Sequence, residues 1–267
     1  MNHARAGIVF STLALLGLAW VAGNCAAGLE DEPAGKFGTI TGQFVFEGEV
    51  PPPELLVAKG DPKVNDPAIC AAVDRFSDAL LVDESTRGIA GVFVYLPKAK
   101  EIHPRLKASA EKEVEFDQEA CRFVPHSLVV RTDQVVVVKS KDKCAHNTRG
   151  TPIRNERFNF SLPPEDRKGV PVRLKVAERF PIPVECNIHP WMKANWLIID
   201  HPYATVSDAE GKFTIADLPA GTHEFILWHE VPGYVERKYS VTVKGGETVD
   251  LGAIKLQAAV FTGKKKQ

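Results

Sequence analysis

The sequence has almost no excess charge of either sign. Its 33 Lys and Arg residues nearly balance 34 Asp and Glu residues, which leaves a formal net charge of −1. Proteins that bind nucleic acid or an anionic membrane through bulk charge carry a basic surface. We therefore expect no nucleic acid among the partners of this chain and no attraction to an anionic membrane through bulk charge.

After the first 27 residues the sequence also lacks the run of ~18–20 apolar residues that a transmembrane helix needs. The one long apolar run covers residues 7–22, follows Arg5 and precedes small residues, which is the pattern of a secretory signal. We predict a signal peptide over residues 1–27 and an exported product, periplasmic or at the cell surface. The run Ala22-Gly23-Asn24-Cys25 resembles a bacterial lipobox, so a lipid anchor at Cys25 is an alternative to a free product.

Helical patterns of ordinary length are missing from the rest of the chain. Nineteen Pro and twenty Gly residues separate short runs of alternating apolar residues, such as Phe37 to Phe46. β-Branched and aromatic residues favour strands, while frequent Pro and Gly favour turns between them. The sequence therefore predicts an all-β fold of sandwich type.

Two turn motifs mark the C-terminal part of the chain. The runs DAEGKF (208–213) and LPAG (218–221) resemble the corresponding turns of carboxypeptidase-regulatory-like, transthyretin-like sandwich domains. Domains of that family begin with strands similar to GTITGQFVFEG (38–48) and GVFVYLP (91–97). In this chain those two strands lie far upstream of the turn motifs.

We interpret residues 36–100 and 201–258 as one discontinuous carboxypeptidase-regulatory-like sandwich, with a second β domain over residues 112–200 inserted between its strands. An insertion at a loop tip costs little when the ends of the insert lie close together. Two sequential domains would instead leave an incomplete sandwich at each end. An acidic linker over residues 28–35 and a basic tail over residues 259–267 complete the expected organisation.

The chemically most distinctive motif is CNIHPWM, which begins at Cys186. It places the thiol of Cys186, the imidazole of His189 and the thioether of Met192 on one short loop. A strong copper–thiolate site uses two His ligands, one Cys and a weak axial Met, so one His is missing from this loop. His146 follows the strand QVVVVKS forty residues earlier and is our candidate, because a sandwich can bring a strand end beside a later loop.

These residues resemble the cupredoxins, the blue-copper electron carriers, and the short loop is especially similar to that of amicyanin. The wider stretch from PHSLVV to His229 resembles exported bacterial proteins of the methylamine-utilisation type. The resemblance implies a Greek-key sandwich with one copper ion that alternates between Cu(I) and Cu(II). It also implies that His146, Cys186 and His189 are equatorial ligands and that Met192 is the long axial ligand.

The resemblance implies further roles around the ligands. Asn147 would tie two loops together, Pro190 would restrict the ligand loop, and Trp191 would cover the metal with an apolar surface. His189 would lie near the protein surface, and the exposed edge of its ring would be the route for the electron. His126 belongs to a Pro-His pair found in the resembling proteins; it is expected either near the metal or in a structural hydrogen bond at a strand start.

Four protein ligands with no position for water or substrate favour outer-sphere, one-electron transfer over hydrolytic or oxygen chemistry. We therefore predict an electron carrier and not an enzyme, and the resemblance implies a redox partner such as a c-type cytochrome. Two other functions remain open. The chain could be an extracytoplasmic binding module whose metal is structural or absent, or a copper storage or delivery protein.

Four of the five cysteines remain after the signal peptide, and an exported compartment is oxidising. Four cysteines allow three full pairings, so Cys186 could be half of a disulfide instead of a ligand. We prefer a pairing of Cys70 with Cys121, because these two flank the junction of the sandwich and the insert. That pairing leaves Cys144 free or transiently paired.

Overall fold

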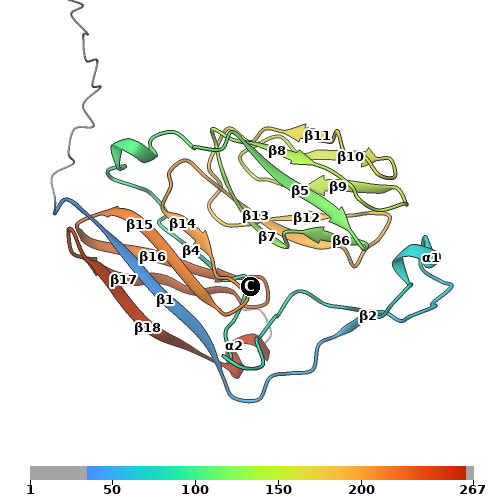
Figure 1. Cartoon of the computed structure of the whole chain (residues 1–267), viewed down its shortest axis with the longest axis horizontal. Coiled ribbons are helices and arrows are strands. Elements are labelled where there is room, and N and C mark those ends of the chain that lie inside the picture. Colours follow the sequence, from blue (N-terminus) through green and yellow to red (C-terminus); the bar gives the residue numbers. More distant parts are fainter. Residues whose placement is uncertain (1–34, 263–267) are drawn as a thin grey trace, which may run out of the picture. The chain divides into compact units, whose positions relative to one another are not determined.

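The computed structural model describes residues 35–262. The predicted signal peptide, Cys25, nearly all of the acidic linker and the C-terminal lysines lie outside the described residues. Within them, regular structure consists of eighteen strands, two α-helices of four and five residues and one 3-10 helix, Pro104–Leu106. The predicted all-β class is confirmed (Figure 1). None of the described helices is long and apolar enough to cross a membrane.

One pair of sheets takes its strands from both ends of the described chain. These strands are β1 (Phe37–Glu47), β4 (Phe93–Tyr95), β14 (Ala204–Val206), β15 (Lys212–Pro219), β16 (Gly221–His229), β17 (Gly233–Val243) and β18 (Thr248–Gln257). They form sheets of order β15-β1-β18 and β14-β4-β16-β17. Every second residue of β1 is buried, as expected of a strand with one face on a core, and Ile40, Phe44 and Phe46 point into that core.

A second pair of sheets takes all its strands from the middle of the chain. These strands are β5 (Glu113–Glu119), β6 (Arg122–Val124), β7 (Ser127–Arg131), β8 (Val135–Val138), β9 (His146–Gly150), β10 (Phe158–Leu162), β11 (Val170–Val172), β12 (Ile182–Glu185) and β13 (Lys193–Ile199). Their orders are β10-β9-β12-β13-β7 and β11-β8-β5-β6. The pairs β7–β13 and β5–β8 are parallel, so the chain crosses between the sheets instead of forming a simple meander. Phe116, Phe123 and Trp196 lie in the core between them.

The two sheet pairs have separate apolar cores. A smaller cluster, which includes Phe93 and Tyr95 of β4 and Leu197 and Ile199 of β13, packs strands of one pair against strands of the other. The described residues form one compact unit. The division into a host sandwich and an inserted sandwich therefore stays an interpretation, which is based on the two sheet pairs and not on a separation in space.

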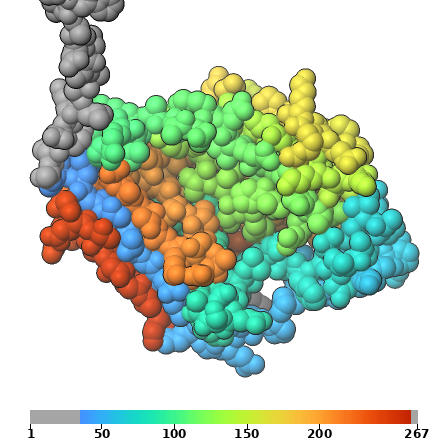
Figure 2. Space-filling view, viewed as in Figure 1, coloured from blue at the N-terminus to red at the C-terminus, as the bar shows by residue number. Residues whose placement is uncertain are grey.

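Residues 51–79 leave the first sheet pair and lie against the second; we call them the cover segment (Figures 1 and 2). The segment holds the short strands β2 (Leu55–Val57) and β3 (Arg75–Phe76) and the helix α1 (Pro67–Cys70). A disulfide joins Cys70 to Cys121, and the Asn65 side chain donates a hydrogen bond of 2.8 Å to the backbone oxygen of Ile188. The cover segment is thereby attached to the second sheet pair at several points.

The chain continues in regular structure beyond the last strand. Residues 259–262, expected at the start of the basic tail, belong to helix α2 (Ala258–Thr262). Phe261 is buried, and its ring packs against Phe46 at 5.3 Å between centroids. An aromatic side chain that reaches the core therefore holds the first residues of the expected tail in place.

Candidate metal centre

Strand pairing brings the two distant parts of the predicted site together. β12 and β13 pair antiparallel, with Glu185 opposite Lys193, so Cys186 to Met192 form the loop between them. Two backbone hydrogen bonds close this loop, from Cys186 N to Met192 O at 3.2 Å and from Met192 N to His189 O at 2.9 Å. β9 pairs antiparallel with β12, and this places His146, the first residue of β9, beside the loop.

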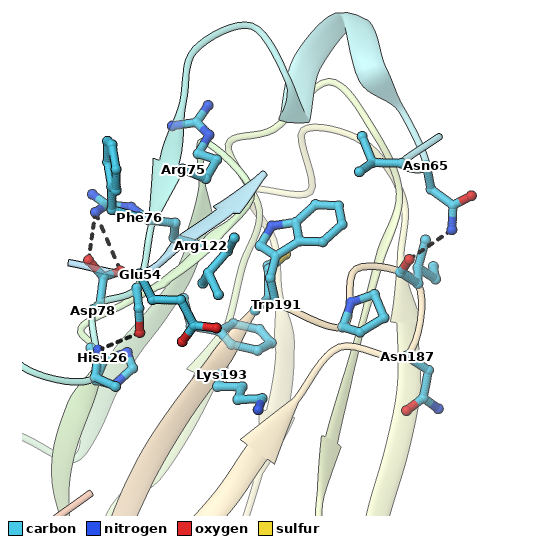
Figure 3. A pocket seen from close by; sticks show the side chains of 18 of the residues that line it. Glu54, Asn65, Arg75, Phe76, Asp78, Arg122, His126, Asn187, Trp191 and Lys193 are labelled. Atoms are coloured by element: carbon cyan, nitrogen blue, oxygen red, sulfur yellow. Dashed lines mark hydrogen bonds and ion pairs between the residues drawn. The ribbon is translucent and has the colours of Figure 1, made fainter. Parts of the chain in front are cut away.

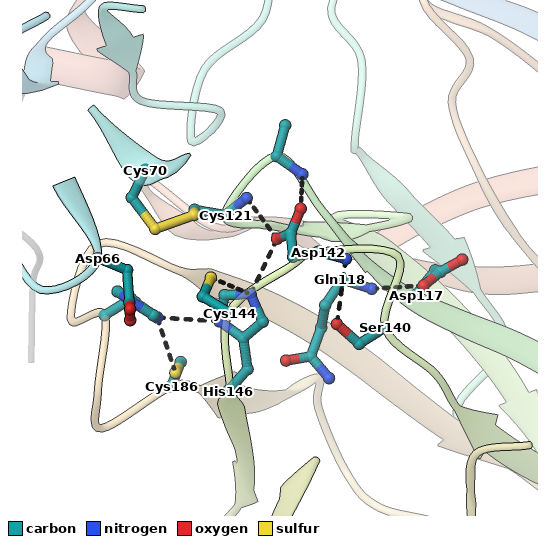
Figure 4. A network of polar contacts seen from close by, with 12 residues as sticks. Asp66, Cys70, Asp117, Gln118, Cys121, Ser140, Asp142, Cys144, His146 and Cys186 are labelled. Atoms are coloured by element: carbon teal, nitrogen blue, oxygen red, sulfur yellow. Dashed lines mark hydrogen bonds and ion pairs between the residues drawn. A yellow bond between two sulfur atoms is a disulfide. The ribbon is translucent and has the colours of Figure 1, made fainter. Parts of the chain in front are cut away.

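Three donor atoms converge there. One ligand atom each of His146, Cys186 and His189 lie within 4.8 Å of one another, and all three residues are buried. The Nδ1 atoms of the two imidazoles are 2.9 Å apart, and the Cys186 Sγ atom is 3.9 Å from the His189 Nδ1 atom. Figure 4 shows His146 and Cys186 near the Cys70–Cys121 disulfide. The structure thus brings together three of the four predicted ligands.

A carboxylate lies on the far nitrogen of each imidazole. The Nε2 atom of His146 is 2.8 Å from Oδ2 of Asp142, and the Nε2 atom of His189 is 3.2 Å from Oδ2 of Asp66. A carboxylate keeps the proton on Nε2, so each Nδ1 presents a lone pair. Two lone pairs that face each other at 2.9 Å repel unless a proton or a metal ion lies between them.

The donor set fits a metal ion. Metal–nitrogen bonds of roughly 2.0 Å and metal–sulfur bonds of roughly 2.3 Å place donors about 3–4 Å apart around one ion. The distances of 2.9 Å between the two Nδ1 atoms and 3.9 Å between Cys186 Sγ and His189 Nδ1 are close to that range. A thiolate with two imidazoles, closed off from water, is a set suited to copper.

Asp142 is a central hydrogen-bond acceptor that no motif in the sequence predicts. Besides His146, it accepts hydrogen bonds from the backbone N–H groups of Ala120 at 2.6 Å and Cys121 at 2.7 Å. Both residues have positive φ in the turn between β5 and β6. Burial alone would raise the pKa of Asp142, but its hydrogen bonds lower it below the ordinary value. The only sequence signal was an acid four residues before His146.

Asn147 connects β9 to the ligand loop. Its Oδ1 atom accepts hydrogen bonds from the backbone N–H groups of Asn187 at 2.6 Å and Ile188 at 3.3 Å, and lies 3.4 Å from Cys186 Sγ. Its amide donates to Asn159 Oδ1 at 2.8 Å, which fixes the orientation of the side chain. Loss of Asn147 would leave two backbone donors of the loop without an acceptor.

The other predicted residues divide between the site and its surroundings. The ring of Trp191, which follows Pro190, lies 5.2 Å from that of His189 between centroids, and its Nε1 atom donates to the Cys121 backbone oxygen at 3.2 Å. Met192 is buried in the core of the second sheet pair. His126, which directly precedes β7, does not lie beside the metal donors. Its ring contacts the carboxylate of Glu230 instead, so His126 makes the structural hydrogen bond expected at a strand start.

The expectation that His189 lies at the protein surface is wrong. Its exposed fraction is 0%, because the cover segment places Asp66 on its outer nitrogen. Asp66 precedes α1 in the left-handed backbone conformation, with φ of 52°, and its side chain is 41% exposed. No local pattern could reveal this contact, since the two residues are 123 positions apart.

The cysteines are not equivalent. Cys70 and Cys121 form a disulfide, while Cys144 and Cys186 are free and buried. Burial raises the pKa of Cys144 to about 12. Burial also opposes ionisation of Cys186, but hydrogen bonds with His146 and His189 lower its pKa to about 6. Cys186 is therefore the thiol that is poised to act as a thiolate.

The metal-free site contains two groups whose titrations change the stability of the protein in opposite directions. Burial would lower the pKa of His146, but Asp142 and Cys186 raise it from 6.5 to about 9. The contribution of His146 to the free energy of unfolding is therefore fully present below pH 6.5 and is lost as the pH rises through 9. The Cys186 pKa falls from 9.0 to about 6, so its contribution is present above pH 9.0 and lost as the pH falls through 6. Because one contribution is lost over the pH range in which the other appears, the stability from this pair should change little between pH 6.5 and pH 9.

Urea unfolding of the metal-free protein at about pH 5, 7.5 and 10 checks this expectation. The Cys186→Ser variant is the control, because it lacks the thiolate that holds the His146 proton. The variant keeps only the His146 contribution, which is lost as the pH rises, so the difference in unfolding free energy between wild type and variant should be larger at about pH 10 than at about pH 5. A difference that does not change with pH would contradict the ion pair.

The two carboxylates should support metal binding unequally. We expect Asp142→Asn to weaken metal affinity by roughly 10–100-fold, the usual cost of losing a partner behind a metal-bound His. Asp66→Asn should cost less, because the Asp66 side chain is 41% exposed, against 7% for Asp142, and water can replace it. Competitive titration with a Co(II) probe measures both, with Asp61→Asn on the cover segment as control. Equal losses for both variants would contradict this order.

A cleft of about 680 Å³ lies between the cover segment and the ligand loop (Figure 3). Leu56 and Phe76 of the cover segment, together with Trp191 and Met192 of the loop, contribute to its lining. Figure 3 shows the Trp191 ring in the middle of this cleft, with Lys193 nearby. Trp191 therefore contacts the ring of His189 on one side and faces the cleft on the other.

No family model matches this chain, and no curated protein matches it. Among solved structures, the Cu-containing nitrite reductase from Thermus scotoductus is 16% identical with a TM-score of 0.30, over 39% of this chain and 28% of that one. The matched part of the chain thus spans little more than a quarter of the nitrite reductase.

Two smaller structures are similar over most of their own length. The purple cupredoxin from Nitrosopumilus maritimus is 16% identical with a TM-score of 0.27, over 32% of this chain and 97% of its own. A variant of amicyanin in the Cu(I) form is 12% identical with a TM-score of 0.28, over 39% of this chain and 97% of its own. All three likenesses cover only part of this chain.

Proposed function

We propose that this protein is an exported copper protein whose single type-1-like site carries one electron at a time to or from a redox partner. The observation that supports it best is the buried convergence of Cys186 Sγ with the Nδ1 atoms of His146 and His189. Copper, when bound, supplies the one-electron change between Cu(I) and Cu(II). Met192, buried at the end of the same loop, is the proposed axial ligand.

The protein's own residues keep the donors in place. Asp142 and Asp66 hold the two imidazole rings from outside, and Asn147 holds the ligand loop through three contacts. Donors that cannot move favour electron transfer, because a change of oxidation state then needs little rearrangement. Their burial excludes water, and with Met192 as the proposed fourth ligand no position remains open for a substrate, which favours a carrier over an enzyme.

The electron route proposed from the structure runs through Trp191. The His189 ring is covered, so a partner has no access to its edge. Trp191 contacts that ring and faces the cleft, which makes the cleft the place where a partner approaches the site. A periplasmic partner such as a c-type cytochrome is part of the proposal. The proposal also includes an inserted sandwich within a host sandwich. It is supported by the strand order, because one sheet pair uses strands from both ends of the described chain and the other uses strands from its middle.

Copper titration followed by voltammetry tests the function. One equivalent of Cu(II) should produce an intense visible band, and the loaded protein should show a reversible one-electron wave. A colourless protein with no redox wave would contradict the carrier and favour the extracytoplasmic binding module. Trp191→Phe should leave the band in place and slow electron exchange with an added cytochrome c.

One observation favours a second candidate, copper storage or delivery. Cys144 Sγ lies 3.6 Å from Nε2 of His146, whereas the Nδ1 atom of the same ring lies 2.9 Å from Nδ1 of His189. A carrier needs no second thiol there. Storage or delivery predicts Cu(I) that a chelator removes readily, and no reversible redox wave.

A further inference from the structure

All four cysteines of the described residues lie in one region of the second sheet pair. Cys144 Sγ is within 4.8 Å of Cys121 Sγ, in a group that also contains Asp142 and His146. It is also within 4.8 Å of Cys70 Sγ, in a group that contains His189. Cys144 is therefore the thiol common to both groups, and it faces both halves of the disulfide (Figure 4).

The ring of His146 separates two sulfur environments. Its Nδ1 edge faces His189 and Cys186, which are the donors of the proposed copper site. Its Nε2 edge faces Asp142 at 2.8 Å and Cys144 at 3.6 Å. The sulfur of Cys144 is thus outside the first donor set, and the role proposed for the protein leaves it unused.

We propose that reduction of the Cys70–Cys121 disulfide creates a second soft-metal site, in which the thiolates of Cys70, Cys121 and Cys144 bind one Cu(I) ion. Two electrons and two protons from an external dithiol break the S–S bond and give two thiols, and the dithiol becomes a disulfide. Binding of Cu(I) then displaces the thiol protons to solvent. This extends the proposed copper function but does not depend on the first site.

The geometry suits three-coordinate sulfur. Three sulfurs at roughly 2.3 Å from one ion lie about 4 Å apart. Cys144 Sγ is already within 4.8 Å of each of the other two sulfurs, so only Cys70 and Cys121 must separate after reduction. All three residues are buried, which keeps water out, and thiolates select Cu(I) over harder ions. In the oxidised protein the disulfide masks two of the three ligands.

The experiment counts copper in oxidised and reduced full-length protein. Each form is loaded with excess acetonitrile-stabilised Cu(I) without oxygen, passed through a desalting column and analysed for copper per chain. We expect one ion in the oxidised form and two in the reduced form. X-ray absorption of the reduced, copper-loaded Cys186→Ser variant, which is expected to hold the second ion alone, should show sulfur ligands only. One ion in both forms would overturn the second site.

Two single variants separate the two sites. Cys186→Ser should bind no copper when oxidised and one ion when reduced, so the second site is testable even if the first proposal fails. Cys144→Ser should keep the first ion. Its affinity for the second ion should fall by more than the roughly 10–100-fold that the loss of a residue behind a metal ligand costs, because Cys144 is itself a ligand. A second ion held as tightly by Cys144→Ser as by wild type would overturn the role of Cys144. Circular dichroism of both variants verifies their folding.

Discussion

The Cys186→Ser variant is expected to lose the intense visible absorption of the copper-loaded protein completely. The band requires a thiolate bound to copper, and a serine hydroxyl provides no sulfur-to-copper charge transfer. Cys186 is the thiol whose pKa is lowered, to about 6, so it is ionised at neutral pH. Its Sγ atom also forms one group with both imidazoles, whereas the Sγ atom of Cys144 lies near His146 in one group and near His189 in another.

Cys144→Ser is the matched control for this result. Cys144 is equally buried and only two positions from His146, but its pKa is raised to about 12 and it faces Nε2 instead of Nδ1. The oxidised Cys144→Ser protein should therefore keep the band. Absorption spectra of both variants after addition of one equivalent of Cu(II) decide between the two thiols. A band that survives in Cys186→Ser would contradict the proposed ligand set.

Removal of the Cys70–Cys121 disulfide is expected to destabilise the metal-free protein by about 4 kcal/mol. The bond joins residues 51 positions apart, and a loop of this length restricts the unfolded chain by about that amount. The double variant Cys70→Ala/Cys121→Ala avoids new buried hydroxyl groups, which would add a cost of their own. At roughly 2–4 °C per kcal/mol for a chain of this size, Tm should fall by about 10 °C.

Chemical reduction provides an independent measure of the same effect. Wild type in excess dithiol without copper should lose about as much unfolding free energy as the double variant, since both lack the cross-link. Cys144→Ser in its oxidised form should remain close to wild type. Urea unfolding of the metal-free forms gives all three values. A loss below about 1 kcal/mol in the double variant would show that the cover segment is held by its other contacts.

Local patterns explain why much of the fold could be predicted. Alternating apolar residues in Phe37 to Phe46 form a strand with one buried face, and β1 covers Phe37–Glu47. The motif from Cys186 to Met192 predicts a ligand loop because its donors are close in sequence and need only one turn to converge. His146 could be placed beside this loop only by expecting that an earlier strand end lies near the loop. The antiparallel pairing of β9 with β12 brings His146 there.

The surroundings of the donors depend on contacts between distant segments. Asp66 reaches His189 across 123 positions, and the cover segment that carries it has no sequence pattern in common with the ligand loop. The same segment brings Cys70 to Cys121 and next to Cys144.

The sequence alone therefore determined the all-β class and the donor types of the candidate site, because both follow from residues within a few positions of each other. Only the tertiary structure decided that His189 is covered, that carboxylates hold both imidazoles, and that three further sulfurs gather beside them. These features arise from packing between segments far apart in the chain, and the packing depends on shape and burial across the whole fold.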